Sequence, residues 1–506
     1  MVLLLLTSCN QRENDQNRIT TTEAFSDLKT PAFVFDYHKI KGNLQKIAWE
    51  TPVEVDVDRV TRSYYLEHDK LLWIDYYGID DRADSLVSWL RLLPEIGLSP
   101  NAFGIVGIEN DIRKLRQLDF DDSQEINRVA ARLEFRLTRA CLRYATGQRF
   151  GYINPRRVFN NLDVEKEDTV HHRTIYRELF DIPVDVPSSS FYRSVLSKIK
   201  NDSIAAFLSE IQPDGKYYRQ MKEMLHEQPD NEQRRCILCN MERGRWRLRQ
   251  PIPESGKYIV VNIPAYHLYA FDADTLLDMR IVCGAQKTKT PLLTSAIEWM
   301  EVNPQWVIPR SIVEKDVVKH VGDTAYFARN RYQIYEKTTN KVIDVSSVSR
   351  SMLLSGNYRV AQQSGSDNSL GRIVFRFKNN YSVFLHYTSN PGAFMRDMRA
   401  VSHGCVRVAK PFELAQYVLD QPDEWLLDRI RISMDIKPET ERGRAYLERH
   451  SEDKEHRLIG YVPVKPHVPL FLIYYTIWPD ENGSVRTWPD VYGYDQIIWE
   501  RLQPYI

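Results

Sequence analysis

Apolar residues recur at intervals of three and four through most of residues 36–239, a spacing typical of amphipathic helices. The clearest run covers residues 126–147, and Gly147 follows it where a helix C-terminal cap would stand. One side of that helix would carry Val129, Leu133, Leu137, Ala140 and Tyr144. We therefore expect residues 36–239 to form an all-α scaffold domain.

The spacing changes after residue 256. The run KYIVVNIPAYHLYAFD alternates apolar and polar residues and is rich in Val, Ile, Tyr and Phe, as β-strands are. Shorter runs of this kind recur at MRIVCG, RIVFRF and YSVFLH, separated by Gly, Pro, Asn and Asp. The pattern predicts an all-β layered domain over residues 256–435, preceded by a linker over residues 240–255.

Two further segments complete the predicted organisation. A polar stretch at about residues 314–358 interrupts the strands, and residues 436–506 form a C-terminal extension expected to pack on the β-rich or the scaffold domain. The predicted fold class is therefore α+β multidomain. It consists of an all-α N-terminal scaffold followed by an all-β, β-sandwich-like domain that carries an insertion.

Composition narrows the class of partner. Lys plus Arg and Asp plus Glu both number 68, so the formal net charge is zero and no basic nucleic-acid surface is expected. At 506 residues the chain can bury a large core, so its folding does not need disulfides.

The first nine residues, MVLLLLTSC, end in a sequence similar to a bacterial lipobox, in which Cys9 would be lipidated. The apolar run is shorter than the ~20 residues that span a bilayer. It also lacks the positive segment typical of a signal peptide, so a chance apolar start is the alternative. Residues 1–9 are interpreted as a partial lipoprotein signal and residues 10–35 as a polar tether.

Two other cysteines form the C-x-x-C pair Cys236 and Cys239. No second pair stands at metal-ligand spacing, which argues against zinc, and no metal or other cofactor is expected. A disulfide and two buried thiols both remain open for this pair.

The candidate chemistry lies at residues 381–408. His386 closes an apolar strand-like run, and Cys405 follows Gly404 in the knot SHGCVR. A thiolate nucleophile needs a nearby base and peptide N–H groups directed at a developing oxyanion. Glycine before the cysteine allows a tight turn and a close approach of substrate. Singly, each residue would more often be structural, but together they predict a Cys–His acyl-transfer site.

The residues LHYTSNPGAF and RDMRAVSHGCVRVAKPFELA closely resemble the large, YcbB-like branch of the YkuD-type L,D-transpeptidases. The motif NMER at residues 240–243 resembles the segment that leads into the catalytic domain in that branch. The peptidoglycan-binding module that larger relatives carry near this junction is not evident in the sequence. The resemblance also implies that residues 314–358 form a capping subdomain, for which an ordinary long insertion is the alternative.

The resemblance implies that Cys405 is the nucleophile and His386, 19 residues upstream, the general base. The backbone carbonyl of Tyr387 would orient the imidazole, and the N–H groups of Gly404 and Cys405 would form the oxyanion hole. Arg407 would hold a substrate carboxylate or orient the site, with a structural ion pair as the alternative. The remaining motif residues, His403 and Ser402, would brace the loop.

The implied activity is peptidoglycan L,D-transpeptidation. The donor is a stem tetrapeptide, the acceptor is the side-chain amine of diaminopimelate on a second stem, and the product is a 3→3 cross-link. Carbapenems would inhibit by acylating the cysteine. A cell-wall L,D-carboxypeptidase or cysteine peptidase, and anchoring of a lipoprotein to peptidoglycan, are the alternatives. The implied location is the periplasm of a Gram-negative bacterium, with a lipid anchor at Cys9.

Overall fold

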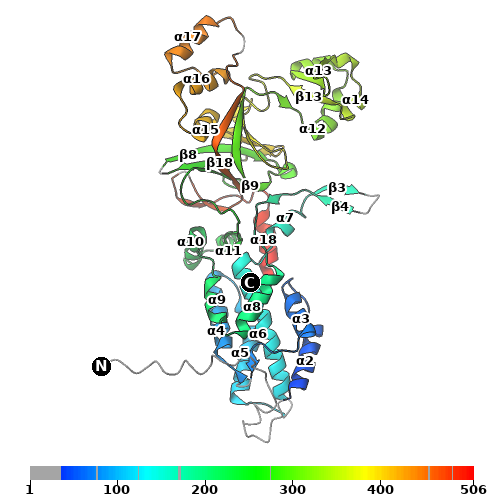
Figure 1. Cartoon of the computed structure of the whole chain (residues 1–506), viewed down its shortest axis with the longest axis vertical. Coiled ribbons are helices and arrows are strands. Elements are labelled where there is room, and N and C mark those ends of the chain that lie inside the picture. The colour runs from blue at the N-terminus through cyan, green and yellow to red at the C-terminus, as the bar shows by residue number, and fades with distance from the viewer. Residues whose placement is uncertain are drawn as a thin grey trace, which may run out of the picture. The chain divides into compact units, whose positions relative to one another are not determined.

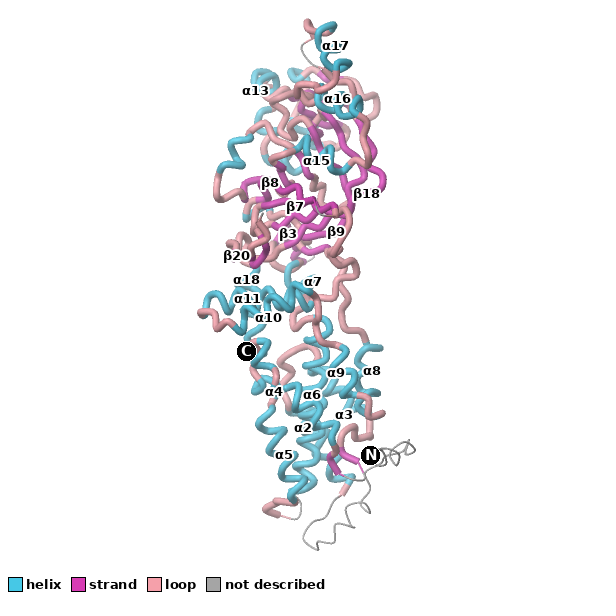
Figure 2. Tube along the Cα trace, turned by 90° about the vertical axis from the view of Figure 1, so that its left-hand side faces the viewer, coloured by secondary structure: helices cyan, strands magenta, loops and turns pink. Residues whose placement is uncertain are grey.

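The computed structural model describes residues 36–75, 78–122, 125–168, 173–273, 275–453, 456–480 and 482–506. The predicted signal, the tether and Cys9 lie outside these residues. Two compact units are present. Unit 1 comprises the residues up to Val158 with Val184–Arg249 and Gly493–Ile506, and unit 2 comprises Phe159–Pro183 and Gln250–Tyr492. Helices dominate unit 1 and strands dominate unit 2, which confirms the predicted fold class (Figures 1 and 2).

Unit 1 is built around α6 (Glu125–Phe150), which packs against α2, α3 and α5. All five positions predicted to share one side of this helix are buried. The other helices of unit 1 are α2 (Tyr37–Glu50), α3 (Asp58–Glu67), α4 (Asp81–Arg91), α5 (Ile105–Gln117), α7 (Pro155–Phe159, at its boundary), α8 (Ser189–Lys200), α9 (Ile204–Glu210), α10 (Lys216–His226), α11 (Asn231–Arg245) and α18 (Tyr494–Leu502). A short strand pair, β1 (Ile74–Asp75) and β2 (Gly78–Ile79), accompanies them.

The sequence predicted that Gly147 caps the C-terminus of α6, and this prediction is wrong. The helix continues to Phe150, and Gly151 follows it with φ +88°, a conformation suited to glycine. A Cβ on Gly147 would stand only 2.0 Å from the Tyr152 ring. Glycine is therefore needed at position 147 for close packing within the helix.

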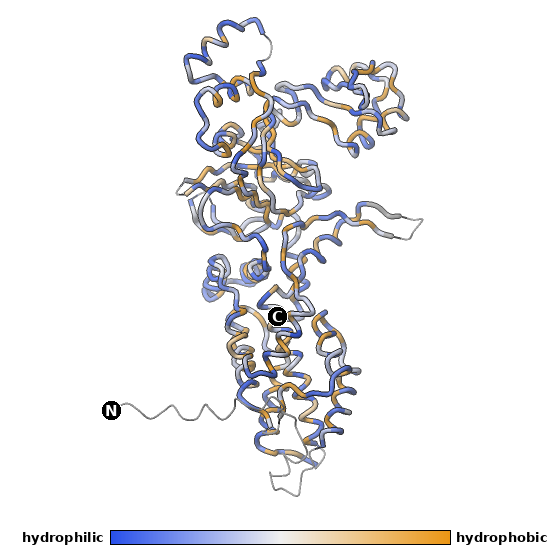
Figure 3. The backbone as a smooth tube through the Cα atoms, viewed as in Figure 1, coloured by the Kyte–Doolittle hydropathy of each residue, from blue (hydrophilic) through white to orange (hydrophobic). Residues whose placement is uncertain are grey.

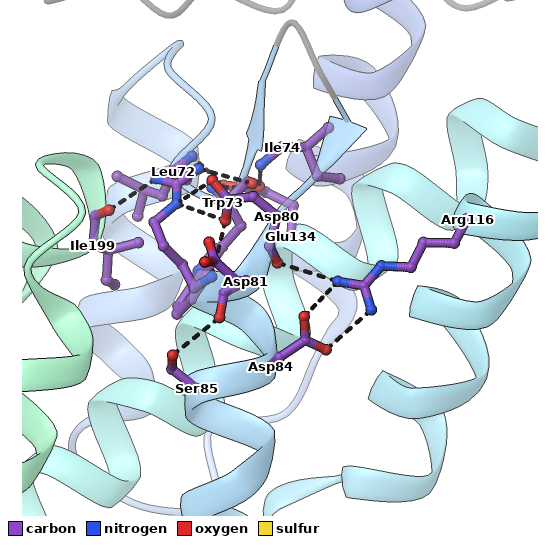
Figure 4. A network of polar contacts seen from close by, with 11 residues as sticks. Leu72, Trp73, Ile74, Asp80, Asp81, Asp84, Ser85, Arg116, Glu134 and Ile199 are labelled. Carbon is purple, nitrogen blue, oxygen red and sulfur yellow. Dashed lines mark hydrogen bonds and ion pairs between the residues drawn. The ribbon is translucent and has the colours of Figure 1, made fainter. Parts of the chain in front are cut away.

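A buried carboxylate on α6 fixes the segment that precedes β1. Glu134 accepts hydrogen bonds from the N–H groups of Trp73 and Ile74, both at 3.1 Å, and from that of Leu72 (Figure 4). It also accepts from the Tyr65 hydroxyl at 2.9 Å. Burial raises the pKa of Glu134 even though these donors oppose the shift. These contacts give the backbone N–H groups of residues 72–74 a partner inside the helical core.

Unit 2 contains one large sheet that closes on itself. Its order is β14-β15-β17-β8-β7-β6-β18-β9, and β14 pairs with β9 as well as with β15. The strands are β6 (Tyr258–Asn262), β7 (His267–Asp272), β8 (Thr275–Gly284), β9 (Leu292–Val302), β14 (Ile373–Phe377), β15 (Leu385–His386), β17 (Val406–Val408) and β18 (Tyr461–Ile473), with β5 (Phe180–Asp181) beside β9 and β16 (Ala400–Ser402) beside β8. Unit 2 also contains three helices and a hairpin outside the large sheet: α15 (Pro411–Val418), α16 (Glu424–Ser433), α17 (Glu441–Arg449), and the pair β19 (Ile477–Pro479) and β20 (Val485–Thr487).

Residues 159–183 belong to unit 2, although the sequence placed them in the helical scaffold. They form the hairpin of β3 (Val164–Asp168) and β4 (Arg173–Tyr176) and the strand β5. The side-chain carbonyl of Asn160 accepts hydrogen bonds from the N–H groups of Leu179 and Phe180, both at 2.8 Å. These bonds hold the end of the 159–183 segment, here called the excursion, beside its start. Pairing of β5 with β9 is a long-range contact that helical spacing does not reveal.

Two other predicted boundaries differ from the structure. Residues 240–245 are the last turns of α11 rather than a linker. Within the predicted C-terminal extension, β18 is an interior strand of the large sheet, between β6 and β9, and α18 belongs to unit 1. Because β18 pairs with both β6 and β9, this late segment of the chain is part of the core of unit 2.

The predicted insertion folds as a small subdomain with its own core. Its four-stranded sheet has the order β10-β13-β11-β12, from β10 (Trp306–Val307), β13 (Tyr358–Gln362), β11 (Tyr332–Glu336) and β12 (Val342–Ile343). Three short helices accompany it: α12 (Arg310–Lys315), α13 (Thr324–Arg329) and α14 (Arg350–Leu354) (Figure 1). Buried residues such as Val317, Phe327 and Ile334 form a cluster of their own.

Apolar residues concentrate along the inner strands of unit 2 and along the packed helices of unit 1 (Figure 3). Within the described residues, none of the helices combines the length and the hydropathy needed to cross a membrane.

Candidate active site

Parallel pairing of β15 with β17 brings the two predicted reactive residues together. Leu385 lies opposite Val406, and His386 lies opposite Arg407. Both Leu385 and Val406 are fully buried, so their side chains point into the core. Because side chains alternate along a strand, His386 and Arg407 lie on the other face.

The pairing continues one residue back, since the Val406 N–H donates to the Phe384 carbonyl at 3.0 Å. Alternation therefore places the side chain of Cys405 on the same face as that of His386, as its diagonal neighbour across the two strands. The sequence could not supply this register, which follows from the parallel pairing of two segments 19 residues apart.

The loop before Cys405 makes a tight turn. Gly404 has φ +116°, which favours glycine. The Ser402 hydroxyl donates to the Cys405 carbonyl at 2.6 Å and accepts from the Gly404 N–H at 3.1 Å. These are the contacts that a loop brace would make. The Gly404 N–H therefore already has a partner, while within the described chain no partner is assigned to the Cys405 N–H.

The thiol of Cys405 is part-buried and lies 3.7 Å from the Ser382 carbonyl. Burial raises the pKa of Cys405. The Phe384 backbone and the charges of Arg376 and Arg407 act in the opposite direction. At rest the residue is therefore a neutral thiol near pH 7, and a base has to remove its proton.

Burial, and secondly the positive charge of Arg407, lower the pKa of His386 to about 4. The backbone carbonyls of Tyr387 and Leu370 act in the opposite direction, although neither closes a standard hydrogen bond to the buried Nδ1 atom. The predicted role of the Tyr387 carbonyl stays a prediction. A neutral imidazole is the form that can accept a proton from the thiol.

Two arginines face this pair, and they differ in their partners. Arg376 makes a two-pronged ion pair with Glu301, at 3.0 and 2.9 Å, and lies over the Phe384 ring. Arg407 has no acidic partner among the described residues, and its Nε atom is buried without a hydrogen bond. Burial lowers the pKa of Arg407, although an arginine remains charged at neutral pH. The predicted role of Arg407 in holding a substrate carboxylate stays a prediction.

His403 lies apart from this arrangement. Its side chain is exposed, and the structure gives it no bracing contact, unlike Ser402. The sequence analysis missed Arg376, whose charge faces the pair, and Thr290, whose hydroxyl donates to the Gly404 carbonyl at 2.8 Å. A lone arginine in a strand and a threonine 115 residues from the cysteine carry no local signal of these roles.

The described residues contain no cluster of His, Cys, Asp and Glu able to hold a metal ion. The five described cysteines are free thiols, with Cys239 buried and Cys236 part-buried on α11, so this C-x-x-C pair is not a disulfide in the structure.

Comparison with known families matches residues 256–432 to the YkuD L,D-transpeptidase catalytic domain. This chain carries a YkuD-family L,D-transpeptidase catalytic domain. Residues 58–225 match a family described as the Scaffold domain. The predicted family is thereby confirmed, and the catalytic match contains both strands of the site.

A curated relative supports the same family. The chain is 30% identical over 329 residues to a Haemophilus influenzae protein provisionally named an L,D-transpeptidase. The alignment covers 63% of this chain and 62% of that protein, so the chain spans less than two thirds of the relative's length.

Proposed function

We propose that the chain is a peptidoglycan L,D-transpeptidase that forms 3→3 cross-links through an acyl-enzyme on Cys405. The observation that carries the proposal is the β15–β17 register. It puts the thiol, a neutral imidazole and a cation that has no acidic partner among the described residues on one face. Membership of the L,D-transpeptidase family supports stem peptides as the class of substrate.

In the first half-reaction, His386 accepts the thiol proton while Sγ bonds to the carbonyl carbon of the third donor residue. The Cys405 N–H would stabilise the oxyanion, and the Gly404 N–H could join it by leaving the Ser402 hydroxyl. When the intermediate collapses, the C–N bond to D-Ala breaks, and His386 returns the proton to the leaving amine. Arg407 would meanwhile pair with a carboxylate of the stem.

In the second half-reaction, the side-chain amine of an acceptor diaminopimelate attacks the thioester. A C–N bond forms, the C–S bond breaks, and the proton lost by the amine returns to sulfur through His386. Neither step needs ATP. Water in place of the amine would give an L,D-carboxypeptidase, and a protein amine would give anchoring of a lipoprotein to the wall.

The test is to incubate the protein with purified tetrapeptide muropeptides and to read the products by mass. Release of D-Ala with a 3→3 dimer supports transpeptidation, whereas D-Ala release and tripeptide alone supports the carboxypeptidase. A Cys405→Ala variant should form neither product and no covalent adduct with meropenem. An adduct that persists on this variant at another cysteine would overturn the assignment of the nucleophile.

We also propose a periplasmic location with lipid attachment at Cys9. The support is the lipobox-like sequence, which lies outside the described residues. Growth of an expressing Gram-negative host with an alkyne-tagged fatty acid should label the protein. Equal labelling of a Cys9→Ala variant would rule out this anchor.

A further inference from the structure

A short segment between β8 and β9, residues 285–290, lies against the loop that carries Cys405. The Thr288 hydroxyl donates to the Ser402 carbonyl and the Thr290 hydroxyl donates to the Gly404 carbonyl, both at 2.8 Å. A Cβ on Gly404 would stand 3.7 Å from the Thr288 carbonyl oxygen and 3.9 Å from that of Lys289. The segment therefore touches the residue that immediately precedes the nucleophile.

Thr290 links this loop to the end of β8. It is fully buried, and its hydroxyl accepts from the Gly284 N–H at 2.9 Å while it donates to Gly404. Its own N–H donates to the Tyr492 hydroxyl at 3.0 Å, which in turn donates to the Gly284 carbonyl at 2.8 Å. Each of these polar groups is paired, so valine, which has the same shape without a hydroxyl, would break two contacts.

Residues 159–183 in turn hold the segment 285–290 in place. The Lys289 ammonium contacts both carboxylate oxygens of Asp163, at 2.7 and 2.8 Å. Arg177 donates to the Lys287 carbonyl at 3.0 Å and to the Lys289 carbonyl at 3.2 Å, and it lies 3.7 Å from Asp163. Both Asp163 and Arg177 lie within the Scaffold match and outside the catalytic match, yet they belong to unit 2.

These contacts are not ordinary surface ion pairs. The Lys289 side chain is only 8% exposed, so removal of its carboxylate partner would leave a nearly buried charge without compensation. The segment would then have to move, and both threonine hydroxyls that hold the Cys405 loop move with it. Supporting contacts of this kind fix the groups that meet the substrate.

We propose that Asp163 and Arg177 are positioning residues for Cys405, acting through Lys289, Thr288 and Thr290 on the 402–405 loop. The inference rests on the proposed function only in that the loop's backbone must stabilise an oxyanion. It assigns to a part of the Scaffold match a direct role in shaping the catalytic loop.

The test uses the full chain with Asp163→Asn and Thr290→Val. The controls are Thr290→Ser, which keeps the hydroxyl, and Asp480→Asn, which alters a buried carboxylate that pairs with Arg486 elsewhere in unit 2. Acylation of Cys405 by meropenem, followed by intact mass, should slow at least ~tenfold in both test variants. Alkylation of Cys405 by iodoacetamide needs the thiolate but no oxyanion hole, so its rate should stay within about twofold. A purely structural loss would lower the melting temperature without separating these two rates.

A second measurement does not depend on the reaction. Hydrogen exchange of the peptide that contains residues 402–406 should be faster, at least ~tenfold, in Asp163→Asn and Thr290→Val, and unchanged in both controls. The proposal is overturned if neither exchange nor the acylation-to-alkylation ratio differs from the unsubstituted chain, or if Asp480→Asn produces the same changes. Should the unsubstituted chain react with neither meropenem nor tetrapeptides, the proposed function fails, and exchange alone still decides the positioning role.

Discussion

At the scale of single residues, the site combines a neutral thiol with an imidazole that resists protonation. Burial shifts the pKa of Cys405 upward and that of His386 downward, and both shifts favour the uncharged pair. Proton transfer therefore has to accompany attack on the substrate. In the proposed reaction the half-buried Arg407 would then assist, since its charge would stabilise the thiolate and the oxyanion that form.

The general base can be identified by comparison of two histidines. His386→Ala should reduce the rate of Cys405 acylation by meropenem by ~10²–10⁴-fold, because no other base lies on that face of β15 and β17 in the described structure. His403→Ala is the matched control, since His403 is exposed on the adjacent loop, and it should change the rate only slightly. If His403→Ala proves the more damaging at equal thermal stability, the base has been assigned to the wrong residue.

The pH dependence provides a separate check. Because the His386 pKa is lowered to about 4, the neutral base should persist well below pH 6.5, and the acid limb of kcat/KM should lie near pH 4. Arg407→Met removes the second cause of the lowered pKa, so the acid limb should move toward higher pH. Burial, the larger cause, remains, and the shift should be partial. An acid limb already at pH 6.5 in the unsubstituted chain would contradict a buried base.

At the scale of elements, the sequence predicted what local pattern can encode. The positions of α6 and of the strands β6 and β7 follow from spacing and residue type, whereas the assignment of His386 and Cys405 as a pair came from the family resemblance. The excursion at residues 159–183, the interior place of β18 and the packing role of Gly147 depend on contacts between distant segments. Thr290 acts on Gly404 in the same way, and a lone threonine gives no periodic signal.

The small subdomain built on β10–β13 gives a prediction at this scale. A thioester must meet an amine before water, so a transpeptidase needs a cover that admits the acceptor selectively. Trp306 pairs with Gln362 and Val307 with Ala361, so residues 308–360 can be replaced by an Asn-Gly turn without separating the two strands. We expect the shortened chain to hydrolyse more donor relative to cross-linking, while meropenem still acylates Cys405.

The ratio of tripeptide to dimer, read by mass, measures this effect. Val342→Ser is the control, because it changes an exposed position of β12 and leaves the subdomain core intact. An unchanged ratio in the shortened chain would mean that the subdomain is a structural excursion and does not act as a lid.

At the scale of the whole molecule, each unit closes its core with segments that are distant in sequence. Unit 2 takes residues 159–183 from within the Scaffold match, and unit 1 takes residues 493–506 from the end of the chain.

The C-terminal residues pack deeply in unit 1. The Tyr505 ring lies 4.5 Å from that of Tyr152 and 6.0 Å from that of Phe103, and the Ser99 N–H donates to the Tyr505 carbonyl at 2.9 Å. Sequence patterns do not show such returns, because a contact between distant segments leaves no periodic signal in either one.

Because residues 493–506 belong to unit 1, a substitution among them should destabilise unit 1 without unit 2. Tyr505 is 5% exposed, so Tyr505→Ala should lower the free energy of unfolding of unit 1 by about 3–5 kcal/mol, as loss of a buried aromatic ring does. Ile506→Ala, at a residue 37% exposed, is the control and should change it by less than about 0.5 kcal/mol. In urea, Tyr505→Ala should shift one of two unfolding transitions and leave the rate of Cys405 acylation at 25 °C unchanged, since Cys405 lies in unit 2. A single transition that shifts as a whole, with acylation lost in parallel, would show instead that the two cores unfold as one cooperative body.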